Sequence, residues 1–414
     1  MRRIAVVAPT TWDLEELARF AGPLEFDFLD DACAPPKSVG LRQLLAPFDV
    51  LAYVDRLVAR IGRPDGIVGT DEYLAAAVAA IAAERLGLPG PPPASVLLCQ
   101  HKFACRLAQR DVVPDAVPGF EIVDPSDLRP PSLPFPLFVK PVRGTFSVLA
   151  RRVDSFDALR AHVLLGILER RAALNLLAPF NALLKRHTSI PLTANYFIAE
   201  EPLAGSLATV EAFASGGDVR VIGISDSVFH PGTMSFLRFD YPSRLPDAVQ
   251  RRMEEIARAL VPRLGLDRTV FNVEMFADGD HVRVLEVNPR MAYQFADLYE
   301  KVDGINTYEI QLALATGVEP RLERGRGKWR VASSFVFRKF GDARLVRQPA
   351  ADALKADFPD ARLRTYGTVG RRLSDVEKGV ESYRYGIVNL GGDGWDDLAA
   401  RFERAKRNLA WEFR

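Results

Sequence analysis

The sequence predicts an α/β protein with α+β parts, in which an open parallel sheet covered by helices comes first and antiparallel strands follow. Two patterns carry this prediction. Over residues 1–90, strand-like segments alternate with helix-like segments, as they do in small open α/β sheets. Further along, the apolar segments 271–276 and 282–288 are joined by Ala-Asp-Gly-Asp, which is typical of a hairpin turn.

The composition is that of a soluble globular protein with several subdomains. A chain of 414 residues is longer than one ordinary hydrophobic core requires, and it contains 48% hydrophobic and 26% charged residues. Its 54 basic and 53 acidic residues give a net charge of +1, so we expect neither nucleic acid nor a membrane surface as a partner. The three cysteines lack the spacing of a metal site or a disulfide framework and indicate a reduced, cytoplasmic protein: Cys33, Cys99 and Cys105.

The N-terminal elements are expected to build the open sheet. Residues 4–8 are predicted to form a buried strand, because their apolar run is too short for a signal peptide or a membrane span. Residues 12–20 have helical spacing, a further strand ends at residues 70–72, and the alanine-rich segment 73–86 predicts a helix. Pro-Thr-Thr-Trp follows the first strand in place of a G-x-G-x-x-G loop, so no dinucleotide site is assigned.

Proline-rich stretches mark the boundaries in the rest of the chain. Residues 88–93 form a linker that ends an N-terminal domain at residue 93, and a second stretch leads into a strand at 137–141. We expect a central domain over residues 94–320, with a mobile subdomain at roughly 137–205, and a C-terminal α/β module over residues 321–414. Helices are expected at 156–186, 247–264, 305–315 and 395–409.

The second strand of the predicted hairpin ends in groups that suit a magnesium ion. Successive side chains of a strand alternate between its faces, so Glu286 and Asn288 share one side. Glu274 on the first strand supplies a second carboxylate. Mg²⁺ uses few protein oxygens and completes its shell with water and phosphate oxygens. Arg290 adds a planar fork suited to phosphate or carboxylate. A solvated strand end is the alternative for this segment alone, and the second carboxylate favours a metal site for phosphoryl transfer.

A shared metal site requires that Glu274 and Glu286 leave the same face of the sheet. A two-residue Asp278-Gly279 turn would send Glu286 to the opposite face, because a shift of one residue flips every side chain. A three-residue loop over 278–280 would place both carboxylates on one face, with Gly279 or a neighbour left-handed. We therefore predict an odd-numbered loop, with both carboxylates beside Lys140.

Lys140 is predicted to end a strand that runs into a glycine-containing loop. The backbone N–H groups from Gly144 to Ser147 can approach phosphate oxygens while Lys140 supplies a positive charge. The loop is not a Walker A loop, because it lacks the Gly-Lys-Ser/Thr sequence before a helix. Taken alone, Lys140 is more readily a strand-end lysine that extends to solvent.

The order of these segments resembles the ATP-grasp superfamily, and within it the carboxylate–amine ligases, which include the amino-acid ligases. The resemblance covers roughly residues 65–320. It rests on His-Lys at 101–102, Phe-Val-Lys-Pro at 138–141, Ala-Glu-Glu-Pro-Leu-Ala-Gly at 199–205, Glu274, and Glu-Val-Asn-Pro-Arg at 286–290. It implies a pre-ATP-grasp domain followed by an ATP-grasp fold, ATP and Mg²⁺ as cofactors with Mn²⁺ as an alternative ion, and a homodimer.

The resemblance also implies a role for each candidate residue. ATP would be bound by two lysines, by the loop serine, and by a hinge whose backbone pairs with adenine: Lys102, Lys140, Ser147, Glu200, Glu201 and Leu203. The metal ligands would be Glu274, Glu286 and Asn288. Arg290 would act in catalysis by bracing the transferring phosphoryl group. Glu211 and Arg238 would bind substrate, with a surface salt bridge as an equal alternative for Arg238.

The implied activity is a ligase that phosphorylates a carboxylate to an acyl phosphate, joins it to an amine, and releases ADP and phosphate. A bicarbonate-using carboxylase or carbamoyl-phosphate-type enzyme is the alternative within the superfamily. A non-catalytic ATP-binding regulator is the alternative from another class, because the chain departs from the family pattern at several positions. These are Ser206-Leu207, where a glutamate is common, Met291–Gln294, where many ligases have a glycine pair, and Leu149, where a glycine is common.

Overall fold

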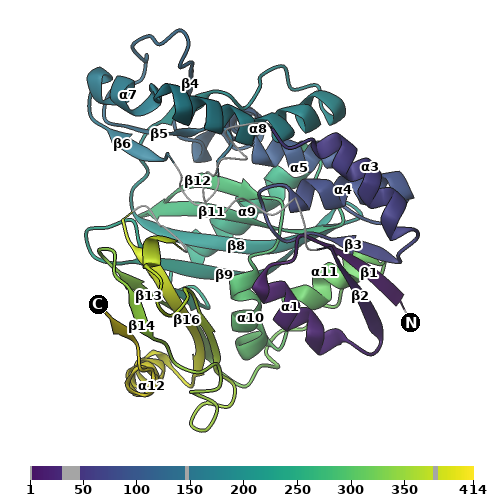
Figure 1. The fold of residues 1–414 in the computed structure, drawn as a ribbon, viewed down its shortest axis with the longest axis vertical. Coiled ribbons are helices and arrows are strands. Elements are labelled where there is room, and N and C mark those ends of the chain that lie inside the picture. Colours follow the sequence, from purple (N-terminus) through teal and green to yellow (C-terminus); the bar gives the residue numbers. More distant parts are fainter. Residues whose placement is uncertain (1, 30–46, 145–148, 376–380) are drawn as a thin grey trace.

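A computed structural model describes residues 2–29, 47–144, 149–375 and 381–414 of the protein (Figure 1). Over these residues the strands form one parallel sheet of three strands and antiparallel sheets of eight, four and two strands. This mixed architecture confirms the predicted fold class. None of the helices in the described ranges has the length and apolar character needed to cross a membrane.

The N-terminal sheet is parallel, with the strand order β2-β1-β3, as the alternating pattern predicted. Its strands are β1 (Arg2–Val7), β2 (Leu24–Leu29) and β3 (Gly66–Val68). They are accompanied by α1 (Thr11–Leu17), η1 (Ala18–Phe20), α3 (Val50–Ile61) and α4 (Ala75–Leu86). Thr10 and Asp13 cap α1 reciprocally, which fixes its first turn directly after β1.

A small antiparallel sheet with the order β4-β7-β5-β6 lies at the top of Figure 1. Its strands are β4 (Phe120–Val123), β5 (Leu137–Pro141), β6 (Arg151–Val153) and β7 (Phe197–Glu200). The helices of this region are α5 (Pro93–Gln100), α6 (Lys102–Val112), η2 (Pro114–Ala116), α7 (Phe156–Val163) and α8 (Ile167–His187). Because β5 and β7 are antiparallel, the end of β5 lies beside the start of β7, and Lys140 pairs with Ile198, two residues before Glu200.

The central sheet has eight strands in the order β12-β11-β8-β9-β10-β13-β16-β15. The strands are β8 (Ser206–Ser215), β9 (Asp218–Phe229), β10 (Phe236–Tyr241), β11 (Thr269–Asp278), β12 (His281–Asn288), β13 (Val331–Lys339), β15 (Arg362–Thr365) and β16 (Tyr383–Gly392). The C-terminal strands thus lengthen the central sheet. A separate pair is formed by β14 (Leu345–Arg347) and β17 (Glu412–Phe413).

The two faces of the central sheet are covered differently. Helix α9 (Asp247–Leu264) packs its apolar side on one face, against alternate residues such as Val210 and Val273. The other face looks toward the N-terminal sheet, with η3 (Tyr293–Phe295), α10 (Ala296–Asp303) and α11 (Thr307–Ala315) between them. The remaining elements, η4 (Leu373–Asp375) and α12 (Trp395–Asn408), belong to the C-terminal part.

Candidate active site

Glu274 and Glu286 lie directly opposite each other on β11 and β12, with their side chains on the same face of the sheet. This confirms the predicted shared face, but the predicted odd-numbered loop is wrong. Asp278 pairs with His281, so the loop has two residues, with Gly279 at φ 58°. A β-bulge restores the register, because Met275 pairs with Val284 and leaves Leu285 as an extra residue.

Asn288 joins the two carboxylates on this face. Its Nδ2 donates to Glu274 Oε1 (3.0 Å) and to Asn272 Oδ1 (2.9 Å), which fixes the amide. Burial, and next the charge of Glu286, raises the pKa of Glu274 to about 7. Two crowded carboxylates with the side-chain amide of Asn288 beside them fit Mg²⁺, since a cation would relieve the repulsion between the carboxylates. No group of three or more His, Cys, Asp or Glu suited to a metal occurs within the described part of the chain.

Lys102 reaches the same place from the first turn of α6. Its Nζ lies 2.6 Å from Glu286 Oε1 and donates to the backbone oxygen of Gly144 at 3.1 Å. His101, the N-cap residue, accepts from the N–H of Ala104 through Nδ1 and contacts the Leu192 oxygen through Nε2. These two contacts of His101 fix the start of the helix next to Lys102. Ser147 lies outside the described residues.

Lys140 and Glu200 form a buried ion pair across β5 and β7. The distance from Lys140 Nζ to Glu200 Oε2 is 2.7 Å, and Arg106 Nε donates to Glu200 Oε1 at 2.6 Å. Although burial opposes ionisation, these two cations lower the pKa of Glu200 to about 2. Arg106 also donates through Nη2 to the oxygen of Leu285, at 2.9 Å. One guanidinium thus ties Glu200 to the bulge that aligns Glu274 with Glu286.

The space at this junction is small in the structure. A cavity of about 10 Å³ remains between α6, the hinge and β12, and its lining includes Lys102, Arg106, Lys140 and Glu200. That volume is roughly one water molecule. Glu201 contacts Gly119, whose N–H donates to its carboxylate (2.8 Å) and whose oxygen accepts its N–H (3.0 Å). Leu203 follows as a half-buried residue of the same hinge.

Arg290 is held by Glu72, which comes from the N-terminal part of the chain. Glu72 Oε2 accepts from Arg290 Nη2 at 3.1 Å, and Glu72 Oε1 accepts from Arg143 Nη1 at 3.0 Å. The pKa of Glu72 is lowered to about 2, because Arg290, Arg143 and Lys102 outweigh the cost of its burial. The carboxylate therefore clamps the arginine after β12 to the arginine beside the Gly144 loop.

The two predicted substrate residues lie on opposite faces of the central sheet. Glu211 is fully buried on the face of Glu274 and accepts from the N–H of Ala292 at 2.8 Å, while its Oε2 has no hydrogen-bond partner among the residues that the structure describes. Burial raises the pKa of Glu211 to about 8. Arg238 alternates onto the other face, where its Nε donates to both carboxylate oxygens of Asp240. The structure therefore does not bring Arg238 to the site.

Three residues of this arrangement were missed by the sequence interpretation. Glu72 lies in the loop that leaves the carboxyl end of the parallel strand β3, which is the end where such sheets place their ligands. Arg106 lies four residues after Lys102 and so shares its face of the helix. Arg143 stands in the loop after Lys140, within the segment already assigned to phosphate. Leu149, in contrast, was noted as a replaced glycine, and its φ of 55° is a conformation that favours glycine.

Comparisons with known proteins find sequence similarity to ligases and structural similarity to ligases and carboxylases. No family model matches the chain. The D-alanine–D-alanine ligase of Mycolicibacterium smegmatis is 25% identical over 307 residues, which are 69% of this chain and 74% of that protein. The solved L-amino acid ligase from Bacillus licheniformis covers 100% of this chain and 99% of its own, with a TM-score of 0.72 and 17% identity. A biotin carboxylase structure from Campylobacter jejuni covers 100% of this chain and 92% of its own chain, with a TM-score of 0.65 and 13% identity.

The structural likeness shows the fold, and the sequence likeness is to ligases. The parallel sheet, the small antiparallel sheet and the central sheet of this chain are all included in the matched region. The chain has the fold of the ATP-grasp ligases, and its sequence is similar to that of D-alanine–D-alanine ligases.

Proposed function

We propose that the protein activates a carboxylate as an acyl phosphate at the expense of ATP and joins it to an amine, releasing ADP and phosphate. The observation that carries the proposal is the pairing of Glu274 with Glu286 on one face, with Lys102 on Glu286. In a structural ion pair, the partner's positive charge would lower the pKa of a carboxylate. Burial and the charge of Glu286 instead raise the pKa of Glu274, so the two carboxylates and the lysine suit a metal-bound triphosphate better than a structural ion pair.

In this proposal the side chains of the protein position ATP and offset the negative charge of its phosphates. Glu274, Glu286 and Asn288 would hold Mg²⁺, which when bound offsets the negative charge of the phosphates. Lys102 and Lys140 would contact phosphate oxygens, and Arg290 would stabilise charge on the phosphoryl group as it moves. Because Glu72 already holds the Arg290 guanidinium at 3.1 Å, little reorganisation would be needed in the transition state.

Nucleotide binding would require the hinge to move. The cavity of about 10 Å³ beside Arg106 and Glu200 is too small for a purine. We expect the small sheet to separate from β12 when the base enters between them, so that Arg106 leaves the Leu285 oxygen. The backbone of Glu201 and Leu203 would then pair with adenine.

Glu211 is the candidate group on the substrate side. It is buried, one of its carboxylate oxygens has no hydrogen-bond partner within the described ranges, and its pKa of about 8 lies near neutral pH. We propose that Glu211 Oε2 hydrogen-bonds the incoming amine. Arg238 has no place in this proposal, since it lies on the opposite face.

A non-catalytic ATP-binding regulator is the second candidate, and the closed junction at Arg106 is the observation that favours it. Carboxylation with bicarbonate is the third, because carboxylases share the fold. A cytoplasmic location and a homodimer stay predictions of the sequence.

One assay separates the three functions. The protein would be incubated with ATP, Mg²⁺ and pooled amino acids while ADP and phosphate are measured, with and without bicarbonate. The proposal expects ADP formation that requires both a carboxylate and an amine. Release of ADP and phosphate that depends on bicarbonate would support carboxylation. Binding of ATP with no turnover in any of these conditions would support the regulator.

A further inference from the structure

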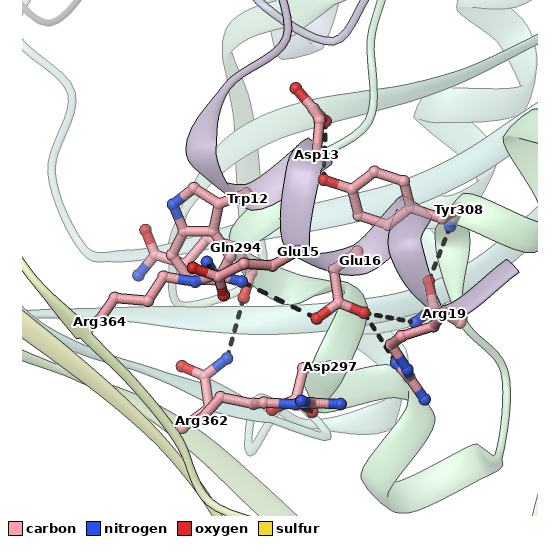
Figure 2. Close-up of polar contacts among 12 residues, drawn as sticks. Trp12, Asp13, Glu15, Glu16, Arg19, Gln294, Asp297, Tyr308, Arg362 and Arg364 are labelled. Atoms are coloured by element: carbon pink, nitrogen blue, oxygen red, sulfur yellow. Dashed lines mark hydrogen bonds and ion pairs between the residues drawn. The ribbon is translucent and has the colours of Figure 1, made fainter. Parts of the chain in front are cut away.

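A group of buried charged and polar side chains joins α1 to α10, α11 and β15, and contacts within the protein account for it (Figure 2). Glu16 accepts from Arg19 at 2.7 Å, and Asp13 accepts from the Tyr308 hydroxyl at 2.8 Å. Each of these carboxylates has a donor against it, so the group holds α1 against its neighbours. A different kind of buried group, a pair of thiols, lies beside the hinge.

Cys99 and Cys105 lie on either side of the corner between α5 and α6. Cys99 is in the last turn of α5, Cys105 is in the first turn of α6, and His101 ends one helix and begins the other. Both are free thiols, each is 3% exposed, and both line the cavity of about 10 Å³ beside Arg106. Since that cavity holds roughly one water molecule, the corner brings the two thiols close together.

The two thiols differ in their surroundings. A hydrogen bond joins them, and Gln109 Nε2 donates to the Cys105 sulfur at 3.1 Å. Burial, and next this hydrogen bond, raises the pKa of Cys99. The hydrogen bond from Cys99, helped by Gln109 and the charge of Arg106, lowers the pKa of Cys105, although burial opposes the change. Cys105 is therefore the thiol that more readily becomes a thiolate, which is the reactive form.

Cys105 is connected to the hinge through a single amide. Gln109, which donates to the Cys105 sulfur, accepts from Arg106 Nη1 at 2.6 Å through its Oε1. Arg106 in turn donates to Glu200 and to the Leu285 oxygen. A change at the Cys105 sulfur is thereby passed to the guanidinium that joins Glu200 to the bulge of β12.

Packing explains part of this arrangement. A buried cysteine often serves as a small apolar residue, and Cys99 and Cys105 belong to the core between α9 and the central sheet. An apolar role requires neither a partner thiol at the same cavity nor an amide N–H directed at the sulfur. Two adjacent thiols, one of them acidified by the other, are the arrangement that a small oxidant converts to a disulfide.

We propose that Cys99 and Cys105 are a modification site at which a peroxide forms a reversible disulfide, and that this disulfide weakens ATP binding. The thiols are reduced at rest, and disulfides of reducing compartments are of this transient, redox-sensing kind. The effect on ATP rests on the proposed function, which places the nucleotide at the junction beside Arg106. The formation of the disulfide does not depend on that function.

The oxidation balances with hydrogen peroxide as the oxidant. The Cys105 thiolate attacks one oxygen, the O–O bond breaks, and hydroxide leaves and takes up the proton that Cys105 had lost. Cys105 is then a sulfenic acid. The Cys99 sulfur attacks the sulfur of this acid, the S–O bond breaks, and the hydroxyl leaves as water with the Cys99 proton. Two thiols thereby lose two electrons, and the peroxide is reduced to two water molecules.

The disulfide would disturb the groups that meet ATP. Once bonded to Cys99, the Cys105 sulfur no longer serves Gln109 as a thiolate acceptor, so Arg106 loses the amide that orients it. Lys102 lies between the two cysteines, so a bond that draws α5 and α6 together also moves its Nζ relative to the metal-site carboxylates. We therefore expect the reduced protein to be the form that binds the nucleotide more tightly.

Peptide mapping of the whole protein tests the disulfide directly. Trypsin cuts after Lys102, so Cys99 and Cys105 fall in different peptides, residues 86–102 and 103–106. The folded protein would be treated with a stoichiometric amount and with a modest excess of hydrogen peroxide, alkylated in denaturant and digested without reductant. We expect the two peptides to be joined after the treatment and to separate when dithiothreitol is added.

Titration calorimetry with Mg²⁺ and a non-hydrolysable ATP analogue measures the consequence. We expect the oxidised protein to bind the analogue at least about tenfold more weakly than the reduced protein, as loss of one charged hydrogen bond implies. Dithiothreitol should restore the affinity, because the disulfide is the only change that it reverses in this experiment.

Three single variants serve as controls. Cys33→Ser leaves the pair intact and should form the disulfide as the wild type does. Cys105→Ser should keep its affinity for the analogue after peroxide treatment, because it cannot form the bond. A sulfenic-acid probe should label residue 105 in Cys99→Ser, which retains the reactive thiol, and should not label residue 99 in Cys105→Ser. Thermal melting would establish that the variants are folded.

The outcomes separate this inference from the function on which its second part rests. Absence of the joined peptides, or a disulfide that uses Cys33 instead, would overturn the modification site. Joined peptides with an unchanged affinity for the analogue would overturn the effect on ATP. If the reduced protein does not bind the analogue, the proposed function fails, and the peptide map still decides whether the disulfide forms.

Discussion

Replacing Glu72 by glutamine tests whether the clamp on Arg290 is as strong as its geometry indicates. Glu72 accepts from Arg290 at 3.1 Å and from Arg143 at 3.0 Å, and its side chain is 13% exposed. Glutamine has the shape of the protonated glutamate but no charge, and its amide nitrogen would face one of the guanidinium groups. The variant therefore removes the charge while keeping the volume.

The magnitude follows from the pKa of Glu72. Its value falls from 4.5 to about 2, so the carboxylate is favoured over a neutral group by roughly 3 kcal/mol at about 1.4 kcal/mol per pKa unit. A chain of this size loses a few degrees of melting temperature for such a change. Because Arg290 would no longer be held, we expect kcat to fall by more than about tenfold, with a smaller effect on the KM for ATP.

Thermal melting and steady-state ADP release would measure the two effects. Glu319→Gln is the matched control, because Glu319 pairs with Arg220 at the surface at 3.1 Å and should contribute at most about 1 kcal/mol. A Glu72→Gln protein with the melting temperature and kcat of the wild type would show that the clamp on Arg290 contributes to neither stability nor catalysis.

Two further predictions follow from the site. Glu286→Gln should reduce Mg²⁺-dependent turnover by at least about 100-fold. It should lower the free energy of unfolding by no more than about 1 kcal/mol, since the pair of Glu286 with Lys102 is partly solvated. Wild-type rates for this variant at saturating ATP and Mg²⁺ would show that Glu286 is not part of the site. Glu211 has a folded-state pKa raised to about 8 from 4.5, so its contribution to stability is complete below pH 4.5 and is lost as the pH rises through about 8. Melting temperatures of wild type and Glu211→Gln between pH 5 and 9 should therefore converge at low pH, with the wild type falling more steeply; parallel profiles would contradict the buried, protonated state of Glu211.

Much of the site could be predicted from local sequence, because strand alternation and residue type together restrict what a strand end can do. Glu274, Glu286 and Asn288 share one face as expected. They share it through a β-bulge, however, and not through the odd-numbered loop that we predicted. Alternation and loop length alone could not give the register, because the bulge at Leu285 has no glycine or proline to mark it, and Arg106 from α6 binds its oxygen.

The missed contacts are those made between distant parts of the chain. Glu72 and Arg290 are 218 residues apart, and no periodicity relates β3 to the end of β12. Arg238 was assigned to substrate from its neighbourhood in sequence, whereas the pairing of β10 with β9 and β13 turns it toward Asp240. Which face a strand residue takes depends on the register of the whole sheet, and that is a tertiary property.

The central claim is the acyl phosphate, and the fate of a carboxylate oxygen tests it most directly. A carboxylate substrate labelled with ¹⁸O would be used in a confirmed turnover with ATP and an amine, and the released phosphate would be analysed by mass. If the carboxylate attacks the phosphoryl group, one labelled oxygen stays with phosphorus when the amine displaces it. We predict one ¹⁸O atom in each phosphate and ADP as the nucleotide product; unlabelled phosphate, or AMP and pyrophosphate, would contradict the mechanism.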